Sequence, residues 1–488
     1  MALVDTRYGK VEGIEKSGIL QFRGIPFAAP PVGARRWRPP EEPAAWHDVW
    51  MADRFRPRAP QARNAGAQLL PAPQDIEASE DCLYLNVFTP GTGSDPKPVM
   101  VWIHGGGFTG GSGRDAWYNG TSFARNNMVV VTINYRLGAL GFMHMGDDFP
   151  GSGNCGILDQ IAALEWVRDN IENFGGDPGN VTVFGESAGG MSIGTLLGTP
   201  AAAGLFDQAV PQSGAAANVH TVDRAAEITD RVTEMIGGRD ALLSAPADRI
   251  VEVAAEVAQS TRGAGLGLGF QPVVDGVVLR SQPIEAIRNG QSAGVRVMTG
   301  TTRDEMTLFL APVPGFTTAT EDDVVRRLDR AEPGRGRQRY DSYRDALGPE
   351  ASPRQLWVAI ETDRVFRIPA IRLAEAQTAH NRDVWMYLFA WESPLRDGLL
   401  GSCHALEIPF VWNSLSARGT EVFAGGGPAA TALAAEMHRS WIAFATAGGP
   451  GWDRYDASRR ATRVFGPGGG VVDDPMGETR RLWERASA

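Results

Sequence analysis

Short runs of consecutive apolar residues alternate with longer stretches of helical periodicity through the middle of the chain. Runs that are apolar on both faces are typical of buried strands in the centre of a sheet. Five such runs occupy residues 99–104, 128–135, 181–184, 295–299 and 384–389. Because strands and helices alternate, the pattern predicts an α/β fold with a central, mostly parallel, twisted sheet flanked by helices.

Two amphipathic helices are predicted from apolar residues that recur at intervals of three and four positions. The first carries Ile157, Ile161, Leu164, Val167, Ile171 and Phe174. The second carries Leu433, Met437, Trp441, Ile442 and Phe444. A glycine pair follows each segment, Gly175-Gly176 and Gly448-Gly449, and supplies the stop that a helix C-terminus favours.

The remaining segments predict additions to this sheet rather than separate domains. Residues 222–260 and 320–380 have helical patterns and are predicted to be insertions that wall a gorge. The first hundred residues are rich in proline and predict edge strands and long surface loops. Since no stretch has the composition of a linker, we expect one domain over residues 1–488.

Composition and charge exclude several classes of protein. The chain has 47 basic and 57 acidic residues, a formal net charge of −10, whereas proteins that bind nucleic acids need a surplus of Lys and Arg. No apolar run approaches the roughly 18 residues of a membrane-spanning helix, so no membrane anchor is expected. Neither an H-E-x-x-H motif nor a cluster of Cys and His is present, so we expect no metal and no cofactor.

The cysteines and the first residues predict a cytoplasmic protein. Cys82, Cys155 and Cys403 are too few, and odd in number, for a disulfide framework, which suits a reducing compartment. The N-terminal segment lacks the basic start and the following apolar stretch of a secretion signal.

The segment Phe184-Gly185-Glu186-Ser187-Ala188-Gly189-Gly190 follows a predicted buried strand and precedes a helical segment rich in small residues. In this context a G-x-S-x-G motif forms a nucleophile elbow, a strained turn that exposes the serine hydroxyl at the edge of the sheet. The alternative is a glycine-bounded turn without chemistry, because the five-residue pattern also occurs by chance. The strand before the motif and the helix after it favour Ser187 as a nucleophile.

A second motif, His104-Gly105-Gly106-Gly107-Phe108, follows the predicted strand 99–104. Acyl transfer develops negative charge on a carbonyl oxygen, and preorganised backbone N–H groups stabilise it. In α/β-hydrolases these donors come from such a loop and from the residue after the nucleophile, here Ala188. A flexible glycine hinge is the alternative, but it does not explain why the loop and the elbow occur together in this order.

Sequence order narrows the partners of the serine, because an acid and then a histidine follow the nucleophile in α/β-hydrolases. Of the seven histidines, His404 is the best candidate base, since it lies in a loop after the predicted strand 384–389. Asp304 and Glu305 end the predicted strand that begins at Val295, and order alone does not separate them.

Further segments along nearly the whole chain match one protein family. They include Phe22-Arg23-Gly24-Ile25-Pro26-Phe27-Ala28, Glu80-Asp81-Cys82-Leu83-Tyr84-Leu85-Asn86-Val87, Asn134-Tyr135-Arg136, Leu158-Asp159-Gln160 and Gln212-Ser213-Gly214. With these segments the chain resembles the type-B carboxylesterases, the esterase and lipase group that includes bacterial p-nitrobenzyl esterases and the cholinesterases. Secreted members pair the cysteine equivalent to Cys82 with an earlier one, which this chain lacks, in agreement with a disulfide-free form.

The resemblance implies an α/β-hydrolase fold and a role for each site residue. The implied triad is Ser187, Glu305 and His404, and the implied oxyanion-hole donors are Gly106, Gly107 and Ala188. Glu186 and Ser213 are implied to support the site. The pairs Arg136–Asp159 and Arg36–Glu80 resemble structural ion pairs of the family.

The expected function is hydrolysis of small-molecule carboxylic esters by a serine carboxylesterase, through an acyl-enzyme intermediate. One alternative keeps the triad and changes the bond to a carbamate or an aryl amide. Another alternative is a non-catalytic, cholinesterase-like binding protein, but such relatives lose the serine or the histidine. The physiological ester and the oligomeric state stay open.

Overall fold

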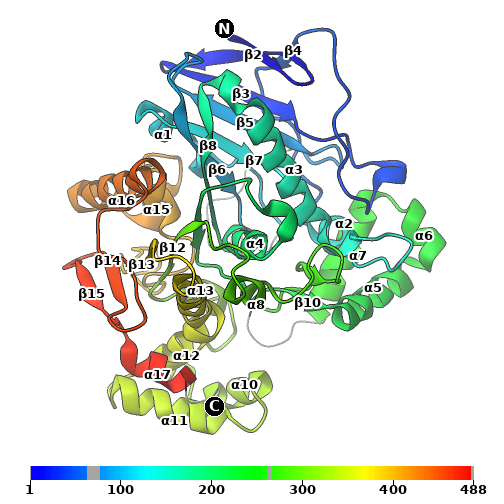
Figure 1. Cartoon of the computed structure of the whole chain (residues 1–488). Coiled ribbons are helices and arrows are strands. Elements are labelled where there is room, and N and C mark those ends of the chain that lie inside the picture. The colour runs from blue at the N-terminus through cyan, green and yellow to red at the C-terminus, as the bar shows by residue number, and fades with distance from the viewer. Residues whose placement is uncertain (1, 63–76, 261–265, 485–488) are drawn as a thin grey trace.

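The computed structural model describes residues 2–62, 77–260 and 266–484. Within these residues a sheet of 13 strands runs through the centre of the molecule (Figure 1). The strands of this sheet are β1 (Ala2–Thr6), β2 (Gly9–Lys16), β3 (Ile19–Pro26), β4 (Trp50–Ala52), β5 (Tyr84–Thr89), β6 (Lys97–Ile103), β7 (Val129–Ile133), β8 (Gly176–Glu186), β9 (Gln208–Gln212), β12 (Arg296–Thr302), β13 (Val384–Phe389), β14 (Ala461–Phe465) and β15 (Val471–Asp473). Their order is β1-β2-β3-β5-β7-β6-β8-β9-β12-β13-β14-β15, and β4 pairs with β2. A two-stranded sheet joins β10 (His220–Thr221) to β11 (Val273–Val274).

The expected mostly parallel sheet is confirmed. From β7 to β14 every neighbouring pair is parallel, whereas β1, β2, β3 and β5 pair antiparallel and β15 pairs antiparallel with β14. The five predicted strands are β6, β7, β8, β12 and β13. The proline-rich start of the chain forms loops and the antiparallel end of the sheet, where β1 is the edge strand and β2, β3 and β5 are paired on both sides.

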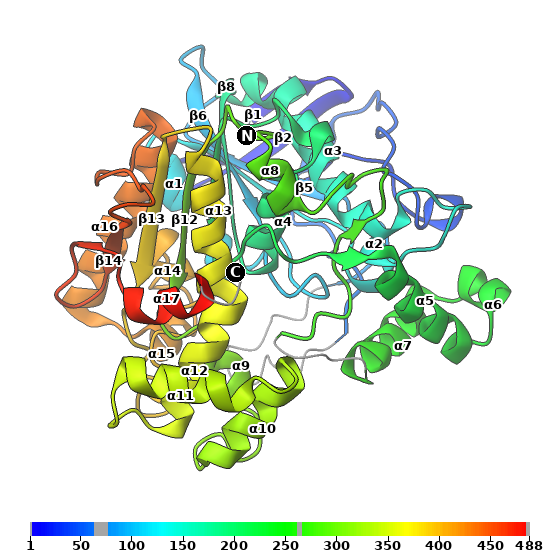
Figure 2. The same ribbon diagram turned by 60° about the horizontal axis from the view of Figure 1, so that its bottom comes forward.

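Helices cover both faces of the sheet. They are α1 (Thr121–Arg125), α2 (Gly138–Phe142), α3 (Cys155–Asn170), α4 (Ala188–Leu197), α5 (Val222–Ile236), α6 (Arg239–Ser244), α7 (Ala247–Ser260), α8 (Pro283–Arg288), α9 (Thr307–Leu310), α10 (Glu321–Ala331), α11 (Gly336–Leu347), α12 (Pro353–Thr362), α13 (Ile368–Thr378), α14 (Ile408–Val411), α15 (Thr420–Ala424), α16 (Gly427–Ala447) and α17 (Gly477–Glu484). The predicted insertions are helical, as α5 to α7 and as α10 to α13. Figure 2 shows α5 to α7 and α10 to α12 as two groups at the periphery, whereas α13 runs alongside β12 and β13.

The two helices predicted from periodicity are confirmed, and each ends where the glycines indicate. A 3₁₀ turn, Ile171–Phe174, completes the segment of α3, and Gly175 follows in the left-handed region at φ 79°. Gly448 ends α16 at φ 73°. In both cases a residue without a Cβ takes the conformation that would strain any other residue.

The side chains of each central strand divide between two cores. In β6, Val101 and Ile103 pack into the core shared with α3, α4 and α13, whereas Met100 and Trp102 pack into the core shared with α1 and α16. This division follows from the alternation of side chains along a strand. It explains why the central strands are apolar at consecutive positions.

Two strands were not expected from the sequence. Strand β9 contains Pro211, which removes a backbone donor and argues against a central strand, yet β9 pairs with both β8 and β12. Strand β14 is short and has two consecutive polar residues, Thr462 and Arg463. Both lack the run of apolar residues that identifies the other central strands.

The two ion pairs implied by the family resemblance are formed. The buried guanidinium of Arg136 contacts Asp159 twice, with Nη2 to Oδ1 at 2.6 Å and Nε to Oδ2 at 2.8 Å. Arg36 contacts Glu80 in the same two-pronged way, with Nε to Oε2 at 2.8 Å. No helix among the described residues is both long enough and apolar enough to cross a bilayer.

Candidate active site

Ser187 lies in the turn between β8 and α4, in a strained conformation with φ 57° and ψ −123°. Hydrogen bonds on both sides hold this conformation: the Ser187 N–H donates to the Gln212 carbonyl at 2.9 Å, and the Met191 N–H donates to the Ser187 carbonyl at 2.8 Å. Strain of this kind persists only where the surroundings enforce it. The turn therefore has the geometry that a nucleophile elbow requires.

Close backbone packing explains the glycines around Ser187. A Cβ atom on Gly185 would lie 2.4 Å from the carbonyl oxygen of Ile103, and one on Gly189 would lie 2.0 Å from the same oxygen. Both distances are far below van der Waals contact, so the end of β6 can approach the elbow only where no side chain intervenes.

The glycine loop after β6 lies against the elbow. A Cβ atom on Gly105 would be 3.0 Å from the Cβ of Ser187, and Gly106 and Gly107 have φ values of 108° and 62°. Among the described residues, the backbone N–H groups of Gly106, Gly107 and Ala188 donate no hydrogen bond. Three unused donors next to a serine can stabilise an oxyanion.

His104 serves this loop as a structural residue. Its buried ring stacks on Tyr135 with ring centres 4.4 Å apart, and its Nδ1 lies 2.8 Å from the Gly105 carbonyl. Burial lowers the pKa of His104 to about 4, which keeps the ring neutral. The Tyr135 hydroxyl donates to the His104 carbonyl at 2.8 Å and fixes the start of the loop.

Glu305 and His404 come together from the ends of two neighbouring strands. The Nδ1 atom of His404 lies 2.6 Å from Oε2 of Glu305, and both side chains are buried. The other carboxylate oxygen of Glu305 accepts the Thr302 N–H at 2.8 Å. Asp304 instead pairs with Arg303 and accepts the Ser402 N–H at 2.9 Å. The alternative that sequence order left open thus has a geometric answer: Glu305, and not Asp304, contacts the imidazole.

The other imidazole nitrogen faces Glu186. His404 Nε2 lies 3.0 Å from Oε1 of Glu186, and within the described part of the chain no hydrogen bond joins His404 to the Ser187 hydroxyl. Such contacts between nucleophile and base are often long until a substrate is bound. Burial and the nearby charge of Glu305 raise the pKa of Glu186 well above its usual range, which favours its neutral form.

Ser213 lies directly behind the elbow. Its N–H donates to the Gly300 carbonyl at 2.9 Å, and its hydroxyl is buried with no hydrogen-bond partner among the described residues. A Cβ atom on the next residue, Gly214, would be 2.6 Å from the Ser187 carbonyl oxygen. Ser213 therefore belongs to the turn that supports the nucleophile from β9.

Sequence reasoning assigned Glu407 no role in the site. Its side chain is fully buried, its Oε1 is 3.4 Å from Gln212 Nε2, and its Oε2 has no partner among the described residues. Burial, followed by the charges of Glu186 and Glu305, raises its pKa well above the usual range. The sequence did contain a signal for Glu407, because it is a carboxylate in the otherwise apolar segment after His404. Buried carboxylates are rare outside functional sites.

Two aromatic rings near His404 also escaped the sequence analysis. Phe309 and Phe366 lie with ring centres 4.9 and 4.8 Å from the imidazole. Phe309 is 37% exposed, whereas Phe366 is 1% exposed. Phe366 lies in the segment 320–380 that was predicted only as helical, and Phe309 lies before it on α9, where no helix was predicted.

A strained serine at a strand-to-helix turn, unused backbone donors and a buried carboxylate–imidazole pair define the class of serine hydrolases with the α/β-hydrolase fold. The family model described as "Carboxylesterase family" matches residues 1–463. The chain belongs to this family and is a serine carboxylesterase, an enzyme that hydrolyses carboxylic esters.

Relatives of the same family match nearly the whole chain. The para-nitrobenzyl esterase of Bacillus subtilis (strain 168) is 38% identical over 491 residues, which are 98% of each protein. The phenmedipham hydrolase of Pseudarthrobacter oxydans is 34% identical over 485 residues, 96% of each. The solved structure of the carboxylesterase EST55 of Geobacillus stearothermophilus at pH 6.2 superposes with a TM-score of 0.89 at 40% identity and covers 99% of both chains.

The burial of Glu407 predicts a pH-dependent loss of stability. The raised pKa of Glu407 means that the folded protein favours the neutral acid, whereas the unfolded chain ionises it in the ordinary glutamate range. The stability of the folded protein therefore falls as pH rises from that range toward the raised pKa. Glu407→Gln keeps a neutral side chain at every pH. Between pH 5 and pH 8 we expect the free energy of unfolding of the variant to rise relative to that of the wild type, by on the order of 1–2 kcal/mol.

Thermal or urea unfolding of both proteins at several pH values measures this difference. Glu256→Gln, an exposed position on α7, is the matched control and should leave the pH dependence unchanged. Parallel stability curves for wild type and Glu407→Gln would contradict the prediction.

Proposed function

We propose that Ser187 is the nucleophile, His404 the general base and Glu305 the acid that orients His404. The observation that carries this proposal is the 2.6 Å contact between Glu305 and His404, with the imidazole beside the strained turn that presents Ser187. We also propose that residues 1–488 act as one catalytic domain, because a single sheet takes up strands from both ends of the chain.

In the first half of the reaction, His404 Nε2 accepts the proton of the Ser187 hydroxyl as its oxygen attacks the ester carbonyl. The carbonyl oxygen becomes negatively charged, and the N–H groups of Gly106, Gly107 and Ala188 donate to it. Glu305 stabilises the imidazolium that forms. His404 then protonates the leaving alcohol, and the acyl group stays on Ser187.

In the second half, His404 deprotonates a water molecule, whose oxygen attacks the acyl carbon. The bond from this carbon to the Ser187 oxygen then breaks, His404 returns the proton to Ser187, and the carboxylic acid is released. Glu186 and Ser213 support this cycle without reacting. Glu186 lies against Nε2 of His404 at 3.0 Å and limits the space open to the imidazole, while Ser213 braces the elbow through its bond to β12.

We infer that the favoured substrates are small esters with an aromatic alcohol. The leaving alcohol must lie close to His404 to receive its proton, and the exposed ring of Phe309 lies at the same place. An aromatic alcohol can stack on this ring. The similarity to a para-nitrobenzyl esterase supports the same class of ester.

We also infer that the enzyme works in the cytoplasm. Cys82, Cys155 and Cys403 are buried free thiols, which suits a reducing compartment. Burial raises the pKa of Cys155 to about 11, so its reactive thiolate is scarce at neutral pH.

The triad assignment predicts a ranking of variants. Ser187→Ala should lower kcat by roughly 10⁴–10⁶-fold with the fold intact. Glu305→Gln should lower kcat strongly because the imidazolium loses its charge partner, whereas its neighbour control Asp304→Asn should change mainly stability. Steady-state kinetics with p-nitrophenyl acetate, combined with mapping of a fluorophosphonate label, measures each effect. Labelling at Ser192 or Ser213, or a larger kcat loss in Asp304→Asn than in Glu305→Gln, would refute the assignment.

The substrate proposal predicts selective damage by Phe309→Leu. Because a stacked aromatic pair contributes about 0.5–1.5 kcal/mol beyond area burial, KM for p-nitrobenzyl acetate should rise roughly three- to tenfold. KM for ethyl acetate, which has no ring to stack, serves as the control and should stay within about twofold. An equal rise for both esters would reject an aromatic alcohol site at Phe309.

The proposed compartment predicts that reduction has no effect. Activity and melting temperature should be the same with and without millimolar dithiothreitol, because Cys82, Cys155 and Cys403 form no disulfide. A fall in either quantity on reduction would show that a disulfide stabilises the native enzyme.

A further inference from the structure

A wide helical turn separates α12 from α13. Residues Asp363–Arg367 form a π-helical turn in an otherwise continuous helix, and the Ile368 N–H donates to the carbonyl of Asp363, five residues back. The cause lies in Pro369, which has no N–H and whose ring would meet the carbonyl of Val365 in a regular α-helix. Single π-helical turns are rare and occur frequently at functional sites.

This turn places Phe366 against His404. The ring of Phe366 is 4.8 Å from the imidazole, at an angle of 38° between the planes, and it is 1% exposed. Phe309 packs on both rings, 4.9 Å from the imidazole and 6.2 Å from Phe366. The imidazole therefore rests on one fully buried ring and is covered by one that reaches solvent.

The same turn also reaches the acid side of the site. Thr362, the last residue of α12, accepts the backbone N–H of Met306 through its hydroxyl at 3.2 Å. Met306 directly follows Glu305 in the chain. One short segment thus contacts both the residue after Glu305 and the ring of His404.

A buried polar network holds the turn in place. Arg367 Nη2 contacts Asp363 Oδ2 at 2.6 Å, and the Tyr343 hydroxyl donates to the same oxygen at 2.6 Å. The indole N–H of Trp483, on α17, donates to the Tyr343 hydroxyl at 2.6 Å. A buried pair of this kind is strongly destabilising when one partner is lost, so it fixes the geometry of the segment that carries it.

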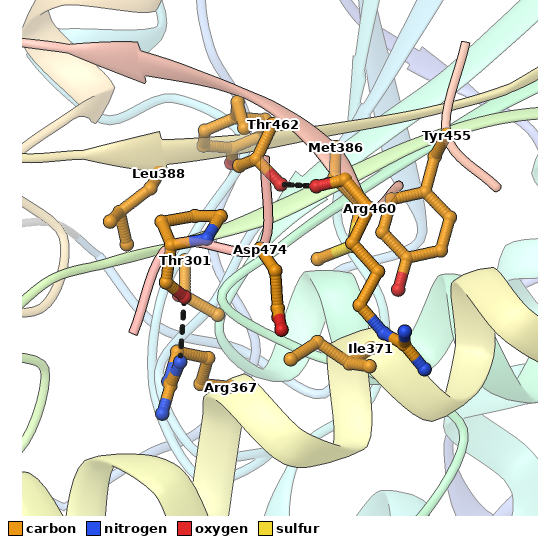
Figure 3. Close-up of a pocket in the computed structure, with 11 residues that line it drawn as sticks. Thr301, Arg367, Ile371, Met386, Leu388, Tyr455, Arg460, Thr462 and Asp474 are labelled. Atoms are coloured by element: carbon orange, nitrogen blue, oxygen red, sulfur yellow. Dashed lines mark hydrogen bonds between the residues drawn. The ribbon is translucent and has the colours of Figure 1, made fainter. Parts of the chain in front are cut away.

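Arg367 adds a direct link to the C-terminal segment. It donates to the Thr479 hydroxyl at 2.6 Å and to the Pro475 carbonyl at 3.2 Å. Figure 3 shows Arg367 in a small cavity that residues of β12, β13, β14 and α13 also line. None of the candidate site residues lines this cavity, so the network lies behind the site rather than in it.

We propose that Phe366 is a positioning residue for His404 and that the π-helical turn, anchored by Asp363, Arg367 and Tyr343, sets its position. The proposal rests on the proposed function, in which His404 is the base. Nδ1 of His404 must face Glu305 while Nε2 faces the space between Glu186 and Ser187. Contact with the buried ring of Phe366 keeps the imidazole in the orientation that satisfies both requirements. Displacement of a reacting group by about 1 Å can cost on the order of a hundredfold in rate, so a ring that prevents such displacement affects kcat.

The first test replaces the ring and keeps an apolar side chain. Phe366→Leu should lower kcat for p-nitrophenyl acetate about tenfold and leave KM within about twofold. Phe316→Leu is the matched control, because Phe316 is also a buried ring but packs on Trp357 at 5.9 Å, and it should leave kcat unchanged. The proton NMR signal of the hydrogen-bonded Nδ1–H of His404 should broaden in Phe366→Leu, because the imidazole becomes mobile.

A second variant tests the network at a distance from the site. Tyr343→Phe removes the hydroxyl that bridges Asp363 and Trp483, and it should lower kcat about threefold with KM unchanged. Tyr340→Phe on the same helix is the control, because Tyr340 makes no contact with Asp363, and it should leave kcat unchanged.

His404→Gln separates this inference from the proposed function. If His404→Gln keeps its activity, the assignment of the base is wrong. If His404→Gln is inactive while Phe366→Leu and Tyr343→Phe keep the kcat of the wild type, the positioning role is wrong. A kcat loss that follows the fall in melting temperature equally in all variants, the controls included, also overturns it.

Discussion

The site depends on one backbone contact, the approach of the end of β6 to the turn after β8. The Ile103 carbonyl occupies the space where Cβ atoms of Gly185 and Gly189 would lie, at 2.4 and 2.0 Å. Because this contact joins neighbouring parallel strands at their carboxyl ends, the loop after β6 and the elbow after β8 must lie side by side. The proposed nucleophile and the proposed oxyanion donors are therefore brought together by the sheet itself, before any side chain is considered.

Burial of charge is the second constraint, and it explains the composition of the site. Glu186, Glu305 and Glu407 lie close together with His404, and no buried lysine or arginine of the described ranges contacts them. Three carboxylates in so small a volume cannot all be ionised at low cost, and the raised pKa values of Glu186 and Glu407 express this. Of the three carboxylates, Glu305 is the one that contacts Nδ1 of His404, where a carboxylate can pair with an imidazolium.

Sequence patterns were sufficient for the parts of the fold and site that depend on local rules. Buried strands such as β6 and β13 need consecutive apolar residues, and the turn at Ser187 needs small neighbours between a strand and a helix. Both features can therefore be recognised in the amino-acid sequence. Strand β9 could not be predicted from its sequence, because Pro211 argues against a strand. Pairing with β8 and β12 stabilises β9, rather than the β-propensity of its own residues. Glu305 could be chosen over Asp304 only by resemblance, since the direction of each side chain depends on how the segment after β12 meets the loop after β13.

The contact of Phe366 with His404 could not be predicted from the residues around Phe366 in the sequence. Its sequence neighbours describe one more helix, and only Pro369 signals that the helix is interrupted. What the interruption does depends on contacts with α11, with α17 and with the loop of His404, which lie 20 or more positions away in the chain. The sheet supplies nucleophile, donors, acid and base from its strand ends, which are constrained by hydrogen-bonded neighbours. The ring that supports the base comes instead from an inserted helix, which no strand pairing constrains. The position of the Phe366 ring must therefore be fixed in another way, and the buried Asp363–Arg367 ion pair fixes it.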